Sequence, residues 1–290
     1  MNRCAAFVFA LCCACLSVSS ACFAQPADWL RFSLEAGRET NQIRADFRGQ
    51  VGGRDDNNWS STFRASDFAG LDLAGFRASG SRPLRFALTR EAGRLDCVGH
   101  GGESYAAGGC AMTSDPGFLG LLAERGIGRP SREQAFGLIA LDVRRDLIDA
   151  VAAAHYPTPT IDNLIEMTAV GVNARYIADL SRLGYRPKAV QNLVEFRALG
   201  ITPEWIGAFA RIGYANVPAD DLVQLKALNV TPEYVMGFER VGYRNMRVDD
   251  LVQLKALNIT PDFARWAAGQ RGPLPPVNDL VEMKVFDRRR

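Results

Sequence analysis

The sequence predicts an α+β protein in which a small antiparallel β domain is followed by a solenoid of helical hairpins. Over 25–114, short runs alternate apolar and polar residues between Gly, Asn and Pro, a period of two that is typical of strands and hairpins. Over 115–290, a motif recurs every 29 residues, as it does in proteins built from stacked units. Because 1–24 differs from both parts, we divide the chain into 1–24, 25–114 and 115–290.

The first part, 1–24, is typical of a secretory signal peptide. Arg3 gives a short basic start, the stretch 4–23 is almost entirely small or apolar, and Cys22-Phe23-Ala24 offers a cleavage site. About 20 apolar residues could instead stay as an uncleaved membrane anchor, but this stretch is only weakly hydrophobic. A lipid anchor on Cys22 is disfavoured, because Ser19 stands where a large aliphatic residue is expected. We therefore expect a periplasmic or secreted protein, with membrane contact only if the segment is uncleaved.

The charge of the chain argues against a nucleic-acid partner. The sequence has 34 Lys and Arg against 32 Asp and Glu, a formal net charge of +2. A protein so close to neutral has no long-range field to attract nucleic acid or an anionic membrane. The basic run at the C-terminus, Arg288-Arg289-Arg290, has too few charges to change this conclusion.

Only two of the seven cysteines, Cys97 and Cys110, lie outside the predicted signal peptide. An even pair in an exported chain predicts one disulfide. A hairpin that pairs 94–98 with 105–112 would also place the two cysteines opposite each other. The bridge would contribute roughly 3 kcal/mol in the chain-entropy account. The alternative is a metal site, since Cys97-x-x-His100 has ligand-like spacing, but a fourth ligand is missing. We expect no metal and no cofactor.

Strands are expected at 29–35, 43–48, 59–63 and 84–89, followed by the hairpin that carries the cysteines. About 90 residues can close only a small sandwich, a barrel or a curled meander. Asp55-Asp56-Asn57-Asn58 is expected to form a polar hairpin turn, because it lacks the ligand spacing of a calcium loop.

The helical unit is clearest from Asp221 to Gly242. Asp221 lies at the start of a first helix, and Asn229 takes the left-handed position that ends it. Thr231 caps a second helix whose first position is Pro232, and Gly242 ends that helix. Asp115-Pro116 falls in register with Thr231-Pro232, so the array is expected to begin on a second helix directly after the sheet.

Helices of about ten residues are marginal alone in water, so the units must bury their apolar faces against each other and need caps at both ends. The β domain is the expected N-terminal cap. One apolar column repeats at the 29-residue spacing and consists of Leu164, Leu193, Leu222, Leu251 and Leu280. The first unit departs from the pattern, with Ala135 in this column and His155 in the column of helix-ending glycines.

The candidates for catalysis are few. His100 and Ser104 lie in the Gly-rich stretch 98–109, which is expected to be a long hairpin loop. A nucleophile and its base must be held within hydrogen-bond reach and oriented by a third group. No pattern in the sequence provides that group, so we predict no catalytic residue, and a hydrolase centred on His100 is the least favoured hypothesis.

Charged residues also recur at the repeat spacing. The column that we predict to contact a partner consists of Arg197, Lys226, Lys255 and Lys284. Further columns consist of Glu166, Glu195, Gln224, Gln253 and Glu282; of Arg182, Arg211 and Arg240; and of Glu204, Glu233 and Asp262. Such stripes can bind an extended partner. The alternative is that acids at helix starts and bases at helix ends only stabilise the helix dipole.

The motif over 221–235, closing with Gly242-Tyr243, resembles a repeat of uncharacterised exported bacterial proteins. The same repeat is similar to one appended to membrane zinc-peptidase sensors of the β-lactam-regulator type. In such relatives a β-rich segment precedes the repeats, and 59–63, Gly70-Leu71 and 90–98 resemble that segment. The resemblance implies no particular activity. No His-Glu-x-x-His occurs here, so it does not imply proteolysis either.

Together these observations predict a non-enzymatic, exported protein-interaction or scaffold module with a protein partner in the cell envelope. The alternative is a ligand-sensing accessory of an envelope stress or antibiotic response, which the resemblance to the sensors suggests. In that case the β domain would bind a small envelope molecule such as a cell-wall fragment.

Overall fold

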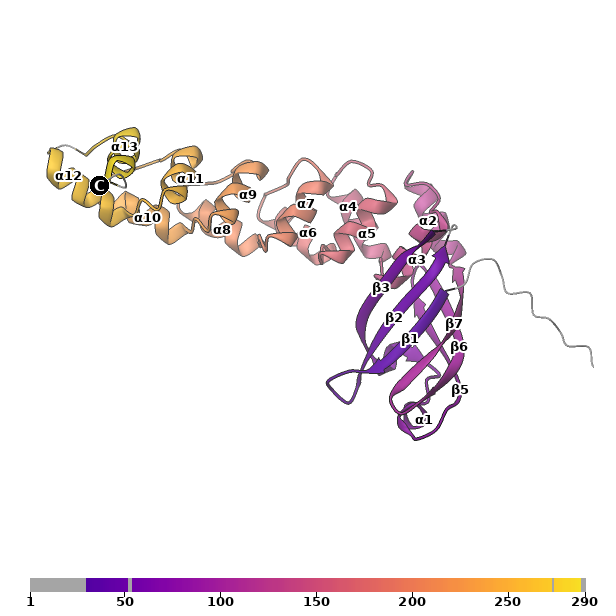
Figure 1. Cartoon of the computed structure of the whole chain (residues 1–290). Helices are drawn as coiled ribbons and strands as arrows, with labels where there is room; N and C mark the ends of the chain where they lie inside the picture. Colours follow the sequence, from indigo (N-terminus) through magenta and orange to yellow (C-terminus); the bar gives the residue numbers. More distant parts are fainter. Residues whose placement is uncertain (1–29, 52–53, 273, 288–290) are drawn as a thin grey trace, which may run out of the picture.

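The computed structural model describes residues 30–51, 54–272 and 274–287 and confirms the α+β class. A seven-stranded antiparallel sheet is followed by an elongated row of helices that extends away from it (Figure 1). The predicted signal peptide lies outside the described residues. The strands are β1 (Leu30–Ala36), β2 (Gln42–Val51), β3 (Arg54–Arg64), β4 (Phe68–Ala69), β5 (Arg82–Arg90), β6 (Gly93–Gly102) and β7 (Tyr105–Ser114).

The connection between β3 and β4 forces the sheet to roll up. The strand order is β3-β2-β1-β7-β6-β5-β4, so these two strands form opposite edges. Only a short helical turn, Ala65–Asp67, separates them in the chain. Three residues span at most about 10 Å, so the two edges must lie close together. The rings of Phe63 on β3 and Phe68 on β4 are 5.0 Å apart. The domain is therefore a curled sheet with an enclosed apolar face.

Aromatic side chains fill the inside of the sheet and connect it to the helices. The rings of Phe32 and Phe86 are 4.9 Å apart, and those of Phe47 and Trp59 are 5.8 Å apart. Phe136, from the helix α3 (Arg132–Ala140), reaches within 6.3 Å of Phe47. The first helices therefore close one end of the curled sheet, and the sheet in turn caps the helical array.

The predicted register of the last hairpin is confirmed, because Cys97 on β6 lies directly opposite Cys110 on β7. A disulfide joins the two sulfur atoms on the buried side of the sheet. His100 lies three residues beyond Cys97 on the same strand, so its exposed side chain is on the other face. Cys97 and His100 therefore cannot act together as metal ligands.

Two predicted loops are strands. The strands β6 and β7 continue through the Gly-rich stretch 98–109 and leave only Glu103 and Ser104 as a two-residue turn, with φ of 55° and 66°. A short helix, α1 (Leu73–Arg77), was not predicted, and the carbonyl of Phe76 within it accepts the N–H of Ser104 at 2.9 Å.

The predicted polar turn 55–58 is also wrong. Its backbone belongs to β3, where Asn57 pairs with Gly49 and Asn58 with Arg48 of β2. The reversal between the two strands falls at 52–53, outside the described residues.

The helices after the sheet form two rows. In the first, α3 and then α5 (Ile161–Ala169), α7 (Val190–Ala198), α9 (Ala219–Ala227), α11 (Val248–Ala256) and α13 (Val277–Asp287) start at steps of 29 residues. In the second, α2 (Pro116–Glu124), α4 (Arg145–Ala153), α6 (Ala174–Arg182), α8 (Pro203–Arg211), α10 (Pro232–Val241) and α12 (Pro261–Arg271) do the same. Within each row, helices pack on the next of the same row, as between α5 and α7 or between α10 and α12. We call these the odd row and the even row (Figure 1).

The predicted helix ends are confirmed. The hydroxyl of Thr231 accepts the N–H of Tyr234 at 3.2 Å, with Pro232 at the first helical position. Asn229 ends α9 with a φ of 54°, and His155, in the glycine column, takes the same left-handed conformation with a φ of 57°. Residues adjacent to these helix ends therefore fix where the helices of this unit begin and end.

The leucine column lies at the centre of the array. Its five members, Leu164, Leu193, Leu222, Leu251 and Leu280, each have 0% exposure. They belong to one continuous apolar cluster that runs from Leu30 in the sheet to Leu280 in the last helix. Among the described residues, no helix combines the length and the apolar character needed to span a bilayer.

Candidate partner-binding surface

Each member of the predicted partner-binding column lies over an aromatic ring. The charged group is 5.1 Å from the ring centre for Arg197 over Tyr176, 5.2 Å for Lys226 over Trp205, 4.7 Å for Lys255 over Tyr234 and 4.9 Å for Lys284 over Phe263. These distances fall within the range of cation–π attraction. We refer to these four pairs as the cation–ring ladder.

The cation–ring ladder joins the two rows of helices. Lys255 lies in the last turn of α11, whereas Tyr234 lies in the first turn of the preceding even helix, α10. The same relation holds along the array, because each cation follows its ring by 21 residues, as 255 follows 234. These cations therefore do not point freely into solvent. Each side chain is half-buried, with its charge held on a ring of the neighbouring helix.

Tyrosine hydroxyls form a second set of contacts between units. Tyr185, Tyr214 and Tyr243 lie just after even helices, and each hydroxyl donates to a backbone carbonyl 32 residues ahead, at 2.6 to 2.8 Å. Within the even helices, the hydroxyl of Tyr176 donates to the Ile201 carbonyl at 2.9 Å. Burial raises the pKa of Tyr185 and of Tyr243 to about 12. Each unit thus holds the backbone of the next one through a neutral hydroxyl.

The acids at the starts of the even helices behave as the dipole alternative predicts. Glu204 lies at the second helical position of α8, where its own backbone N–H and the Thr202 hydroxyl lower the pKa of its carboxyl. Asp262, in the same column, pairs with Arg265 one turn later. This column stabilises helix starts.

Two other columns are exposed along the length of the array. On the even row, Arg182 pairs with Asp179, whereas Arg211 and Arg240 make no ion pair with any described residue. On the odd row, the exposed column consists of Glu166, Glu195, Gln224, Gln253 and Glu282. Apart from Arg182 and from Glu195, which accepts a hydrogen bond from Asn192, these side chains make no polar contact with a described residue and, unlike the cation–ring ladder, are free to meet a partner.

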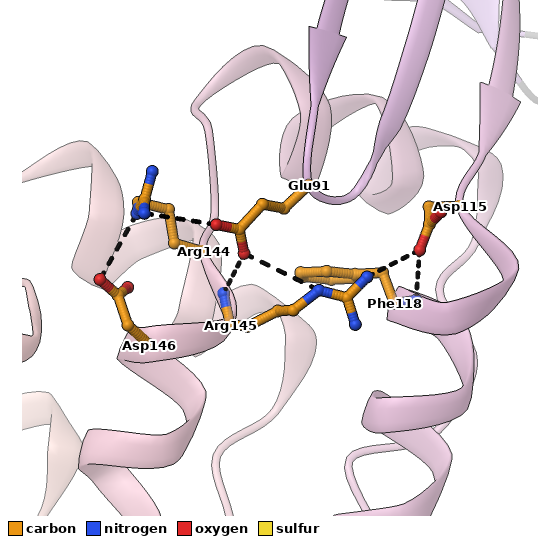
Figure 2. Close-up of polar contacts among 6 residues, drawn as sticks. All are labelled: Glu91, Asp115, Phe118, Arg144, Arg145 and Asp146. Carbon is orange, nitrogen blue, oxygen red and sulfur yellow. Dashed lines mark hydrogen bonds and ion pairs between the residues drawn. The ribbon is translucent and has the colours of Figure 1, made fainter.

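A charged cluster joins the sheet to the array (Figure 2). The helix α4 lacks a side-chain cap of its own, because its N-cap residue is Arg144. Glu91, in the turn between β5 and β6, takes this role and accepts the backbone N–H of Arg145 at 2.8 Å. The guanidinium of Arg145 also donates to Asp115 at 2.7 Å and lies 5.4 Å from the ring of Phe118. The sheet therefore supplies an N-cap to a helix of the array.

Arg144 holds the other side of this cluster. Its guanidinium is 3.3 Å from a carboxylate oxygen of Glu91 and 3.4 Å from one of Asp146. These acids, Asp146 first and then Glu91, raise the pKa of Arg144. A further ion pair, Arg90 with Asp142 at 3.8 Å, lies at the same joint.

The residues considered for catalysis are not brought together. His100 lies on the outer face of β6 opposite Ala107, and Ser104 lies in the turn that follows. Among the described residues, neither side chain has a hydrogen bond or an ion pair that would orient it. The geometry therefore offers no nucleophile–base pair at this place.

The aromatic half of the cation–ring ladder was missed in the sequence, although a signal was present. Tyr176, Trp205, Tyr234 and Phe263 recur at the repeat spacing and always precede a basic residue by 21 positions. No protein-family model, curated protein or solved structure matches the chain.

Proposed function

We propose that this chain is a non-enzymatic, exported interaction or scaffold module that holds a protein partner in the cell envelope. The observation that carries the proposal is the repetition of exposed charged columns along an elongated array of helices (Figure 1). Solenoids use such extended surfaces to bind partners over several units at once. The disulfide between Cys97 and Cys110 is compatible with export.

Stiffness supports this role. The cation–ring ladder and the tyrosine hydroxyls both connect successive units, so the exposed columns keep a fixed spacing. A partner that matches this spacing loses little freedom on binding, because the surface is already ordered. A partner with complementary charges at several units would gain affinity from each of them.

The proposal is tested by capture of envelope proteins on the immobilised, purified chain, followed by mass spectrometry and measurement of affinity for the captured protein. A variant with Arg211→Gln and Arg240→Gln removes exposed charges that have no ion pair among the described residues. We expect it to fold normally and to bind its partner several-fold more weakly, more so at low salt. A matched variant with Glu166→Gln and Glu282→Gln removes two exposed charges from the odd row and reports on that row.

A partner that is held equally well by both variants would remove both exposed columns from the binding surface. Failure of the chain to retain any envelope protein at micromolar concentration, with the fold verified by circular dichroism, would refute the proposal. The cation–ring ladder is not the first place to mutate, because its loss would also weaken the contact between the rows.

A further inference from the structure

Apolar side chains are exposed at the end of the array that lies far from the sheet (Figure 1). Trp266, on α12, is 52% exposed, and Phe286, on α13, is 63% exposed. Met283, one turn before Phe286, is partly exposed. The two preceding units have Leu225 and Leu254 at the position of Met283, each with 0% exposure. We call Trp266, Met283 and Phe286 the terminal face.

Trp266 stands at the position where an even helix receives the next one. The equivalent residue of α10 is Gly237, where an added Cβ would lie 2.6 Å from the Pro261 side chain of α12. A further helix stacked on α12 in the same register would bring its first turn against the Trp266 ring. The residues of this column in α6 and α8 are also smaller than tryptophan, namely Asp179 and Ala208. A further unit therefore cannot cover α12 in the way that α12 covers α10.

The terminal face is an open end of the apolar core. The continuous cluster that begins in the sheet reaches Leu280, and Phe263 and Met283 pack on it while partly exposed. The ring centre of Phe263 is 5.4 Å from that of Trp266 and 4.9 Å from Nζ of Lys284, which places Trp266 beside α13. The end units of a solenoid normally have a polar outer face, because no other unit stacks on them. An apolar end that carries a tryptophan indicates a surface that another molecule covers.

The two ends of the array differ in a way that favours a second copy as the partner. The first end is closed by the sheet, where Phe136 packs on Phe47, so molecules cannot stack head to tail. Two terminal faces can meet around a twofold axis, because each copy presents the same apolar surface to the other. The adjacent charges have both signs, as in the ion pair of Asp262 with Arg265 at 2.5 Å, so one copy does not present a field of a single sign to the other.

We propose that two copies of the chain associate tail to tail through their terminal faces, with Trp266 of each copy packed on α12 and α13 of the other. Tryptophan is among the residues that contribute most to interfaces, because its large rigid ring buries much apolar surface. The resulting dimer has a sheet at each outer end and an array of twice the length between them. It does not depend on a protein partner of the charged columns, so the interaction proposed above can fail without affecting it.

Sedimentation equilibrium of the full purified chain at micromolar concentrations measures the association. We expect the mass of two chains. Trp266→Glu should raise the dissociation constant at least about a hundredfold, because a symmetric contact loses the ring twice and gains two buried charges. Trp266→Ala introduces the residue type of α8 and should raise it at least about tenfold, even if the acidic variant fails to fold. Leu199→Glu places the same charge at an exposed apolar position in the middle of the array. It is the matched control and should leave the dissociation constant unchanged.

Small-angle X-ray scattering distinguishes the terminal face from other contacts. The largest dimension of the dimer should approach twice that of the Trp266→Glu monomer, whereas a side-by-side dimer would have nearly the length of the monomer. A monomeric parent chain at these concentrations, unchanged association in both folded Trp266 variants, or a dimer of monomer length would overturn the proposal. Because Arg288-Arg289-Arg290 follow α13 in the sequence, a membrane is the competing partner. A monomer that binds phosphatidylglycerol vesicles through Trp266 would assign the terminal face to a membrane and overturn the dimer.

Discussion

Removal of all four cations of the cation–ring ladder should destabilise the helical array. The variant changes Arg197, Lys226, Lys255 and Lys284 to glutamine and leaves every other charged residue in place. Each of these cations lies over a ring and is half-buried. A contact of this kind contributes about 0.5–1 kcal/mol when exposed and about 2 kcal/mol when desolvated, so about 1 kcal/mol is expected for each lysine. Glutamine has almost the same helix propensity as lysine and arginine, so the loss reports on the contact.

Arg197 should contribute less than the lysines. Its Nε is buried without a hydrogen-bond partner, which offsets part of the attraction to Tyr176. The four pairs share no residues, so their effects should add, and the quadruple variant should lose about 3 kcal/mol of unfolding free energy. That is a large part of the 5–15 kcal/mol that is usual for a folded domain.

Urea unfolding followed by circular dichroism measures this loss as a lower midpoint with an unchanged slope. Two controls separate the rings from charge in general. A variant with three Lys→Arg changes keeps a cation over each ring and should stay near the parent. Arg211→Gln with Arg240→Gln removes exposed charges and should cost less than about 0.5 kcal/mol. A quadruple variant as stable as the parent, or a charge control that loses as much, would refute the reasoning.

Further outcomes follow from burial. Leu251→Ala should lower the free energy of unfolding, measured in urea, by about 2–5 kcal/mol, because Leu251 has 0% exposure. The control Leu199→Ala, at a position with 39% exposure, should lower it by about 1 kcal/mol or less. Equal effects of the two changes would contradict the helix register. Cys97 and Cys110 should resist thiol labelling in denatured protein until a reductant is added, and labelling of both beforehand would exclude the bridge. Tyr185, with a pKa raised by burial from 10.0 to about 12, favours the folded state fully below pH 10. This contribution, at most about 2–3 kcal/mol, should disappear as the pH rises from 10 to 12, and the part of the tyrosinate absorbance that Tyr185→Phe removes should appear above pH 10.

The helical hairpins were predictable in detail because their signals are local. Thr231 and Pro232 specify a helix start from adjacent residues, and Asn229 specifies a stop by its own tolerance of the left-handed conformation. No long-range information is needed for either. The repetition of these signals also places the leucine column, since equivalent positions in stacked units have equivalent surroundings.

The sheet was predictable only in part, because glycine in a sequence can indicate either a loop or a strand position with no room for a side chain. The stretch 98–109 was interpreted as a loop, since glycine weakens strands. At Gly108, however, an added Cβ would lie 2.8 Å from the ring of Phe32 and 2.2 Å from the carbonyl oxygen of Val98. Glycine is needed there because the inside of the curled sheet has no room for a side chain. Phe32 is distant in sequence, so the requirement is invisible in the local pattern.

The cation–ring ladder shows a different limit of prediction from the sequence, because its contacts join positions that are not equivalent in the repeat. The column of basic residues is visible in the sequence because its members occupy the same position in successive units. Lys255 meets Tyr234 across the boundary between two hairpins, at an offset of 21 residues that is not a multiple of the repeat. Only the packing of odd on even helices makes these positions neighbours.

The contacts between the sheet and the first helices show why the change from strand to helix at 114–115 does not separate two independent folding units. Glu91 in the sheet caps the backbone of Arg145, and Phe136 of α3 packs on the aromatic side chains inside the sheet. An array without the sheet would lose an N-cap worth about 1 kcal/mol and expose a large apolar side chain. Since stability in a stack depends on contacts between nearest neighbours, this loss would fall on the first unit and weaken those that pack on it. The sheet therefore completes the first hairpin, and a groove or surface at the joint requires both parts of the chain.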